Sequence, residues 1–280
     1  MKKSWKGMGM IALAALLWSA QGVLGKAGTW GSLSLVGVRA IFASFVLGCV
    51  RKDFRLPKRP AEWIAGTFVA LTALLFLCAN KLTSASNAII LQYTMPVFVM
   101  LLGVIFLRKK PTAAEIAVSA CVLSGVFLCA SGSTGQGNLL GDGLALLSAI
   151  TYAGVFSAGK LLHVDAKDYS YTGNLLCLLF LLAIPFDPSF DFKPLNVLSA
   201  ALMGLTVGLG YAAFAKGLSE GVQPVTAAII SNIEPVGNPV WVFLFLGEAP
   251  PALSLIGFAI VLTAVTVHGA CLNTAKEEKT

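Results

Sequence analysis

Apolar stretches long enough to cross a lipid bilayer follow one another along nearly the whole chain. A helix needs about 20 apolar residues to span the hydrocarbon core of a membrane. The gaps between the stretches are short and rich in Gly, Pro, Ser and charged residues, which interrupt helices. The pattern predicts ten membrane-spanning helices, at residues 7–26, 32–50, 63–80, 87–107, 115–131, 139–161, 171–186, 196–215, 222–246 and 252–272.

The composition also indicates lipid as the solvent of this chain. Of its 280 residues, 57% are hydrophobic and 12% are charged, whereas a soluble domain carries about 25% charged residues. We therefore expect an all-α polytopic membrane protein with no separate soluble domain. The net charge of +7 does not indicate nucleic acid as a partner, because the basic residues gather in the short gaps between apolar stretches.

One sequence pattern occurs twice in the chain. The pairs that align without gaps are Gly7 with Gly141, Gly9 with Gly143, Trp18 with Tyr152, Lys26 with Lys160, Ala88 with Ala227, Ile90 with Ile229 and Pro96 with Pro235. We interpret residues 1–131 as a first five-helix repeat, residues 139–272 as a second, and residues 273–280 as a tail. Two related halves in an apolar chain favour a transporter, because equivalent halves can exchange conformations around a central site.

The basic residues predict how the helices are oriented. With the N-terminus inside, 16 Lys and Arg residues lie in cytoplasmic segments, three lie in outer segments and Arg39 lies within a span. Such a bias marks the cytoplasmic side, so we expect a bacterial inner-membrane protein with both termini and the tail in the cytoplasm. Five helices is an odd number, so the second repeat enters the membrane from the other side and the repeats are inverted. The basic N-terminal segment resembles a signal peptide in charge, but it belongs to the repeat and is interpreted as a retained first helix.

Glu234 is the one acidic residue well inside a predicted span. A charge in the bilayer centre costs at least a few kcal/mol, so such residues usually face a cavity or a partner. Pro235 and Pro239 are expected to bend the helix and free carbonyls near Glu234, as Pro96 would do in the equivalent helix, and Asn232 adds a polar side chain. Two interpretations stay open: a site for a cationic group or an exchangeable proton, and a structural carboxyl held by Arg39 or by hydrogen bonds.

Several other intramembrane side chains are candidates for substrate contact. Trp18 and Tyr152 occupy equivalent repeat positions near the middle of their spans, where two rings could stack on a substrate ring or enclose an ammonium group. Tyr211, which follows a glycine-rich run, and Trp241 are further aromatic candidates. Gln92 both donates and accepts hydrogen bonds, which suits an uncharged or zwitterionic solute. For each of these, the alternative is packing or hydrogen bonding between helices.

Arg39 is the one cationic residue within a predicted span. It is interpreted as a structural charge that bonds helix-end carbonyls or an acid, with a substrate carboxylate as the alternative. The six cysteines lie in or beside apolar stretches without the spacing of metal ligands, and we expect free thiols. We find no nucleotide-binding loop, no metal motif and no catalytic pairing, so no cofactor and no enzymatic activity are predicted.

The chain resembles the drug/metabolite transporter superfamily, in particular its ten-helix branch built from two EamA-type repeats. The resemblance rests on Arg39 in the second span, on the segment from Trp18 to Lys26, and on the motifs TSASNAIILQYTMPV and VTAAIISNIEPV of the fourth and ninth spans. It implies a central cavity between the halves, lined mostly by spans 1, 3, 4, 6, 8 and 9, and transport of small organic solutes. The halves differ where Met95 aligns with Glu234, and where Asn174 stands near the position equivalent to Arg39.

Together these features predict a secondary transporter that moves an amino acid, an amino-acid derivative or another small amphipathic solute by alternating access. A quaternary ammonium transporter that uses Glu234 and an aromatic cage is one alternative. A channel or a membrane-enzyme accessory is an alternative of a different class. Protons are a candidate coupling ion, and the protein is expected to act in the bilayer as a monomer or a homodimer.

Overall fold

The computed structural model describes residues 2–83, 85–131, 138–246 and 252–277, with some side chains in these ranges left undescribed. All regular secondary structure in these residues is helical. The elements are α1 Lys2–Ser19, α2 Gln21–Ala27, α3 Ser32–Arg51, α4 Pro60–Leu82, α5 Ala85–Gln92, α6 Met95–Leu107, α7 Ala113–Ser131, α8 Leu139–Leu161, α9 Ala166–Cys177, the 3-10 helix η1 Leu178–Phe186, α10 Pro194–Ser219, α11 Pro224–Ser231, α12 Ile233–Leu246 and α13 Ala252–Glu277.

Six stretches of the described chain are long and apolar enough to cross a membrane, judged by length and composition. They are Trp5–Gly25, Ser32–Arg51, Pro60–Ala79, Leu139–Leu161, Ala166–Phe186 and Pro194–Ser219. Three further apolar helices are shorter: Met95–Leu107, Ala113–Leu128 and Leu255–His268. The all-α membrane architecture is thus confirmed, while the number of spans remains a prediction.

Local sequence explains where several helices begin and end. The side chain of Asn138 accepts hydrogen bonds from the backbone at the start of α8, and that of Asp165 does so at the start of α9. Proline occupies the first turn of α4, α10 and α11, where its missing N–H costs no hydrogen bond. At the C-terminal ends of α3 and α6, Lys52 and Arg108 adopt left-handed conformations that stop the helix.

Two predicted spans are broken near their prolines. A proline at position i cannot donate a hydrogen bond to the carbonyl of residue i−4. The residue four positions before Pro96 is Gln92, where α5 ends, and the residue four positions before Pro235 is Ser231, where α11 ends. The two breaks therefore fall at aligned positions, whereas α12 continues as one unbroken helix through residue 239.

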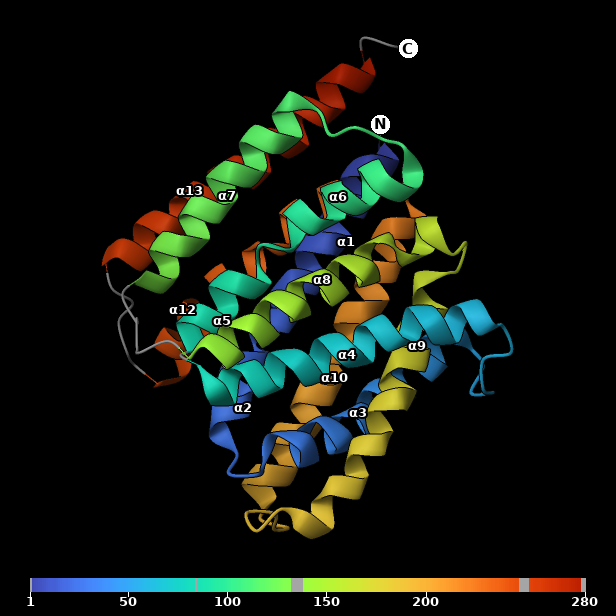
Figure 1. Cartoon of the computed structure of the whole chain (residues 1–280), viewed down its shortest axis with the longest axis vertical. Coiled ribbons are helices and arrows are strands. Elements are labelled where there is room, and N and C mark those ends of the chain that lie inside the picture. Colours follow the sequence, from blue (N-terminus) through green and yellow to red (C-terminus); the bar gives the residue numbers. More distant parts are fainter. Residues whose placement is uncertain (1, 84, 132–137, 247–251, 278–280) are drawn as a thin grey trace.

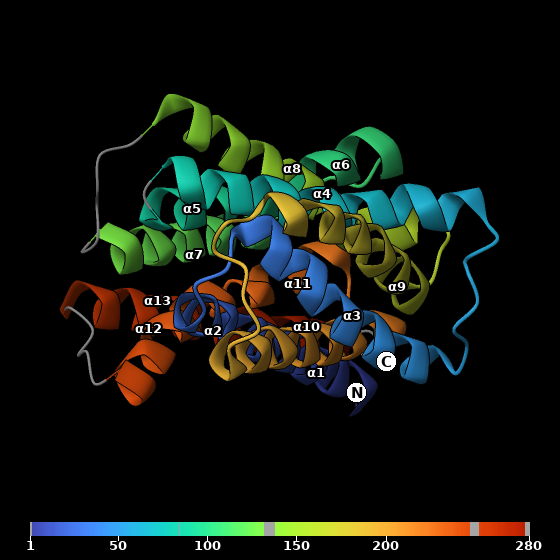
Figure 2. The same cartoon turned by 90° about the horizontal axis from the view of Figure 1, so that it is seen from below.

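The helices pack in pairs that lie far apart in the sequence. Extensive contacts join α1 with α10, α4 with α8, α3 with α9 and α7 with α13. Figure 1 shows α7 and α13 side by side along one edge of the bundle, and Figure 2 shows the same pair from below. Small residues allow close approach: a Cβ atom at Gly208 of α10 would lie 2.8 Å from Val46 Cβ of α3, and one at Gly66 of α4 would lie 2.8 Å from Thr172 Cβ of α9.

The bundle has two ends that matter for the site. The end at which α1 begins and α13 ends is called the terminal end; α3, α6, α8 and α10 also end there (Figure 1). The far end carries the connections from α2 to α3 and from η1 to α10. Between the ends, many large apolar side chains lie exposed on the outside, among them Phe45, Ile105 and Phe127. Lipid is the solvent that such a surface requires.

Candidate functional site

Glu234 lies in the first turn of α12, directly after the break at Asn232. The hydroxyl of Tyr152 on α8 donates to Glu234 Oε2 at 3.4 Å, a long and therefore weak hydrogen bond. No Lys or Arg of the described chain forms an ion pair with this carboxylate. The helix break thus presents a part-buried carboxylate whose charge no neighbouring cation neutralises by direct contact.

Aromatic side chains from α1, α8 and α10 form a continuous group next to this carboxylate. The ring of Trp18 lies 5.0 Å from Tyr211 and 6.4 Å from Tyr152, centroid to centroid. Phe156 lies 5.1 Å from Tyr152 and 5.0 Å from Phe214, with edge-to-face geometry in both pairs. We call these five residues the aromatic group.

The sequence singled out three members of the aromatic group and missed two. Phe156 and Phe214 drew no attention because phenylalanine is common in apolar spans. A helical spacing argument would have found them, since residues three or four apart share a helix face. Phe156 follows Tyr152 by four residues, and Phe214 follows Tyr211 by three.

Four buried polar atoms around Glu234 and the aromatic group lack a hydrogen-bond partner within the described part of the chain. They are Trp18 Nε1, Tyr93 Oη, Ser231 Oγ and Asn232 Oδ1. Of these, the hydroxyl of Tyr93 still interacts with the Glu234 carboxylate. An unsatisfied buried polar group costs about 1–3 kcal/mol, so such groups are usually found where a ligand or water completes them. Tyr93 and Asn232 occupy the two helix breaks, which concentrates this unused polar capacity beside the carboxylate.

Gln92 and Trp241 bond to neighbouring helices. Gln92 Nε2 donates to Ser148 Oγ of α8 at 2.7 Å, and Ser148 in turn bonds to the carbonyl oxygen of Thr72 on α4. Trp241 Nε1 donates to Ser19 Oγ of α1 at 2.7 Å. The structure therefore shows both side chains in helix-to-helix contacts. Pro96 and Pro235 are buried beside the breaks, whereas the side chain of Pro239 lies outside the described part.

Arg39 of α3 bonds to a glutamine instead of an acid. Its Nη1 donates to Gln21 Oε1 on α2 at 2.9 Å, and Gln21 Nε2 donates to Thr206 Oγ1 on α10 at 2.6 Å. No acid of the described chain lies within ion-pair distance of this guanidinium. It nevertheless interacts electrostatically with Glu234 and with Tyr211.

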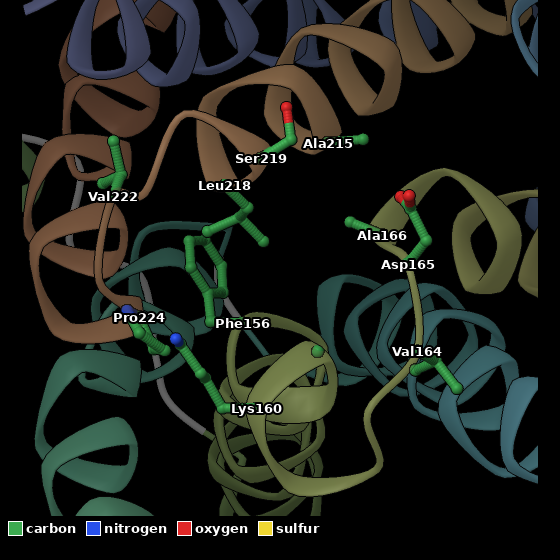
Figure 3. A pocket seen from close by; sticks show the side chains of 11 residues that line it. Phe156, Lys160, Val164, Asp165, Ala166, Ala215, Leu218, Ser219, Val222 and Pro224 are labelled. Atoms are coloured by element: carbon green, nitrogen blue, oxygen red, sulfur yellow. The ribbon is translucent and has the colours of Figure 1, made fainter. Parts of the chain in front are cut away.

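A cavity of about 250 Å³ opens at the terminal end of the bundle (Figure 3). It lies between the ends of α8 and α10 and the starts of α9 and α11. Lys160 and Asp165 supply its charged lining, and Phe156 lines it as well. Phe156 packs on Tyr152, and Tyr152 bonds to Glu234, so a chain of contacts leads from the lining of this cavity to the carboxylate.

Hydrogen bonds join two connections at the far end of the bundle, and we call them the far-end closure. Asp187 accepts from the Gly31 backbone N–H at 2.7 Å, and Asn196 bonds both to Thr29 and to Asp191. Trp30 also donates to the carbonyl oxygen of Asp191, at 2.8 Å. These contacts join the connection between α2 and α3 to the start of α10.

The two acids of this closure are stabilised as carboxylates. Hydrogen bonds from Lys193 and then Asn196 lower the pKa of Asp191 to about 2. Burial by itself raises the pKa of Asp187, but hydrogen bonds from Ser189 and Gly31 outweigh it, so that this pKa lies below its usual value. Both groups therefore carry full negative charge at neutral pH.

In the described residues, no group of three or more His, Cys, Asp or Glu side chains is arranged to hold a metal ion. The site offers one carboxylate, one guanidinium, aromatic rings and unused hydrogen-bonding atoms, which are groups that can bind a small polar or aromatic molecule.

Known proteins resemble this chain in sequence and in fold. An uncharacterized transporter of Archaeoglobus fulgidus is 26% identical over 96% of this chain and 98% of its own length. A probable terminal-alkyne amino-acid exporter of Streptantibioticus cattleyicolor is 27% identical over 65% of this chain and 63% of its own length. The pseudopaline exporter CntI of Pseudomonas aeruginosa is 24% identical over 73% of each chain.

One solved crystal structure superposes with a TM-score of 0.81 over 99% of both chains, at 18% identity, which establishes a shared fold. The sequence profile of the EamA-like transporter family matches twice, at residues 5–131 and at residues 139–269. Together these matches cover nearly the whole chain. The protein therefore belongs to the EamA-like transporter family.

Proposed function

We propose that this protein is a secondary transporter of a small organic metabolite, with amino acids and their derivatives as the favoured cargo. The observation that carries the proposal is the position of Glu234. Its carboxylate lies beside unused polar atoms and the aromatic group, between a cavity at the terminal end and a hydrogen-bonded closure at the far end. Two relatives are named as exporters, one of an amino acid and one of pseudopaline.

The proposed mechanism is alternating access by two inverted repeats, at residues 1–131 and 139–272, with ten spans in total. Helix pairing supports it. If each span of the first half is exchanged with its counterpart in the second, the α1–α10 pair becomes the α8–α4 pair, and the α3–α9 and α7–α13 pairs map onto themselves. Such exchange is what a pseudo-twofold axis in the membrane plane would produce.

The cavity at the terminal end supports a conformation that is open toward that end. The bias of Lys and Arg toward this end supports a cytoplasmic location for it. Cargo would then reach the aromatic group from the cytoplasm through the cavity shown in Figure 3. The helix breaks at Tyr93 and Asn232 would act as bending points when the halves exchange conformations.

A quaternary ammonium compound is the second candidate cargo. Trp18, Tyr152 and Tyr211 offer three neighbouring rings next to Glu234. Aromatic rings attract such cations through the negative face of the π system. Proton coupling through Glu234 and action as a monomer or a homodimer are parts of the same proposal.

The test combines ligand binding with transport. Purified protein would be screened by thermal unfolding against a panel of amino acids, amino-acid derivatives, amines and choline at pH 6 and pH 8, because a ligand that binds the folded state raises the melting temperature. The best ligand would then be followed into proteoliposomes, with and without an imposed pH gradient. Saturable uptake and exchange identify a carrier, whereas uptake that does not saturate identifies a channel and would refute the proposal.

Glu234→Gln is the central variant, and Glu62→Gln, at the first turn of α4, is its control. We expect the first variant to lose the response to ligands that carry an ammonium group and the control to keep it. If both variants respond like the wild-type protein, Glu234 is not part of the binding site.

A further inference from the structure

Arg39 has binding capacity that the protein itself does not use. A guanidinium carries five N–H donors, and in the described part of the chain Arg39 donates one side-chain hydrogen bond, to Gln21. Its side chain is only partly buried. An intramembrane cation without an acidic partner is expensive, and such residues usually mark a substrate or ion pathway.

Glu234 presents the complementary case. Tyr152 donates one long hydrogen bond to it, the hydroxyl of Tyr93 also interacts with it, and it forms no ion pair with Arg39, although the two charges interact electrostatically. Tyr211 interacts electrostatically with both charges, and its ring contacts Trp18. Two opposite charges, neither of them in an ion pair within the described part of the chain, therefore share the aromatic neighbour Tyr211.

We propose that Arg39 and Glu234 are the two ends of a zwitterion site, in which Arg39 with Gln21 binds the carboxylate of an amino acid and Glu234 with Tyr152 binds its ammonium group. The side chain of the ligand would lie on Trp18 and Tyr211. This inference rests on the proposed transport function and narrows its cargo to molecules that carry both charges.

The chemistry explains why such a site would reject near relatives of the cargo. An amine that lacks the carboxylate leaves Arg39 without a counter-charge. A carboxylic acid that lacks the ammonium group leaves Glu234 without one. A buried charge that stays unpaired after binding is strongly unfavourable. A site that must bond a given polar group therefore rejects analogues without it far more strongly than a purely apolar pocket does.

The test uses sets of three matched ligands: an amino acid, the amine that its decarboxylation gives, and the carboxylic acid that lacks its amino group. L-phenylalanine, 2-phenylethylamine and 3-phenylpropionate form one set, and L-leucine, 3-methylbutylamine and 4-methylpentanoate form a second. Affinities would be measured by calorimetry on the wild-type protein and on Arg39→Gln, Arg39→Lys and Glu234→Gln. Arg59→Gln, at the terminal end, is the matched control for loss of a positive charge.

We expect the wild-type protein to bind the amino acid at least tenfold more tightly than either analogue. Arg39→Gln should abolish the preference over the amine but keep the preference over the acid, and Glu234→Gln should do the reverse. Arg39→Lys keeps the charge without the planar fork of donors and should retain only part of the preference. If Arg39→Gln does not fold, the Arg39→Lys variant still tests the role of Arg39. Arg59→Gln should leave all ratios unchanged.

Equal binding of amine and amino acid by the wild-type protein would overturn the zwitterion site, as would a preference that survives in Arg39→Gln. Binding of choline but of no amino acid in the sets would also overturn it, while the transport function would stand. If no metabolite in the wider screen is bound or transported, the proposed function itself fails.

Discussion

Two glycines in each proposed repeat provide a sharp test of how the helices pack. Gly7 of α1 and Gly141 of α8 are aligned in the two repeats, as are Gly9 and Gly143 two residues later. A Cβ atom at Gly7 would lie 2.8 Å from Val222 Cγ2, whereas a Cβ at Gly9 or Gly143 would meet nothing within 4 Å. Neighbouring glycines on one helix thus differ fully in the space around them.

Gly141 meets a more rigid neighbour than Gly7 does. A Cβ at Gly141 would lie 2.7 Å from the backbone nitrogen of Thr83 and 2.8 Å from its Cβ. Thr83 aligns with Val222 in the same gap-free alignment that pairs Pro96 with Pro235. The same close contact is therefore present twice, once in each half of the bundle.

The expected magnitudes follow from these distances. Replacing a helical glycine by alanine gains up to about 1 kcal/mol of unfolding free energy where space is available. Overpacking a tight contact costs about 1–3 kcal/mol. We therefore expect Gly9→Ala and Gly143→Ala to be neutral or stabilising. Gly7→Ala should be destabilising, and Gly141→Ala more so, because a Cβ at Gly141 would lie 2.7 Å from a backbone atom, whereas the nearest backbone atom to a Cβ at Gly7, Gly217 O, would lie 3.1 Å away.

Reversible unfolding of the four single variants in mixed detergent micelles would measure these differences. Comparing Gly7→Ala with Gly9→Ala, and Gly141→Ala with Gly143→Ala, cancels the effect of the detergent on unfolding. If Gly9→Ala and Gly143→Ala lose as much stability as their neighbours, the close-approach argument is wrong. If one repeat follows the expected order and the other does not, the two halves are not equivalent at this contact.

Two further predictions concern charged groups at the ends of the bundle. The part-buried ion pair between Arg51 and Asp168, at 2.7 Å, joins α3 to α9. A double-mutant cycle on this pair should give a coupling free energy of about 1 kcal/mol or more. The exposed Lys167–Asp165 pair, at 3.7 Å, should give almost none. For Asp191, the folded-state pKa of about 2 lies below the unfolded value, so its stabilising contribution is complete above about pH 4 and is lost as the pH falls toward 2. Thermal scans across this range should show a smaller loss of melting temperature in Asp191→Asn than in the wild-type protein, and equal losses would contradict the reasoning.

Hydrophobic patterning predicted most of this fold because a membrane leaves few alternatives. Backbone groups in lipid must be satisfied within a helix, so apolar length alone located α3, α4, α8 and α10 closely. Patterning could not locate the helix breaks, since it carries no information on single hydrogen bonds. The breaks follow from the carbonyls of Gln92 and Ser231, each of which loses its donor to a proline four residues later.

The candidate site was less predictable than the fold, because it depends on which side chains meet. Alignment of the repeats identified Trp18 with Tyr152, and the structure brings them within ring contact. The bond from Arg39 to Gln21 joins two helices and leaves no sequence signal. For the same reason, nothing in the sequence showed that Gln92 bonds to Ser148.

The differences between the halves indicate how one scaffold can serve different cargoes. Positions that set helix packing are alike in both halves, as the paired glycines and prolines show. Positions beside the helix breaks are unlike: Tyr93 aligns with Asn232, and Met95 with Glu234. Exchange of conformations between the two halves requires the helix-packing positions to stay equivalent. Recognition of an asymmetric molecule requires the positions beside the helix breaks to differ. Substitutions at the breaks should therefore change cargo preference with little effect on the fold, and substitutions at the paired glycines should do the opposite.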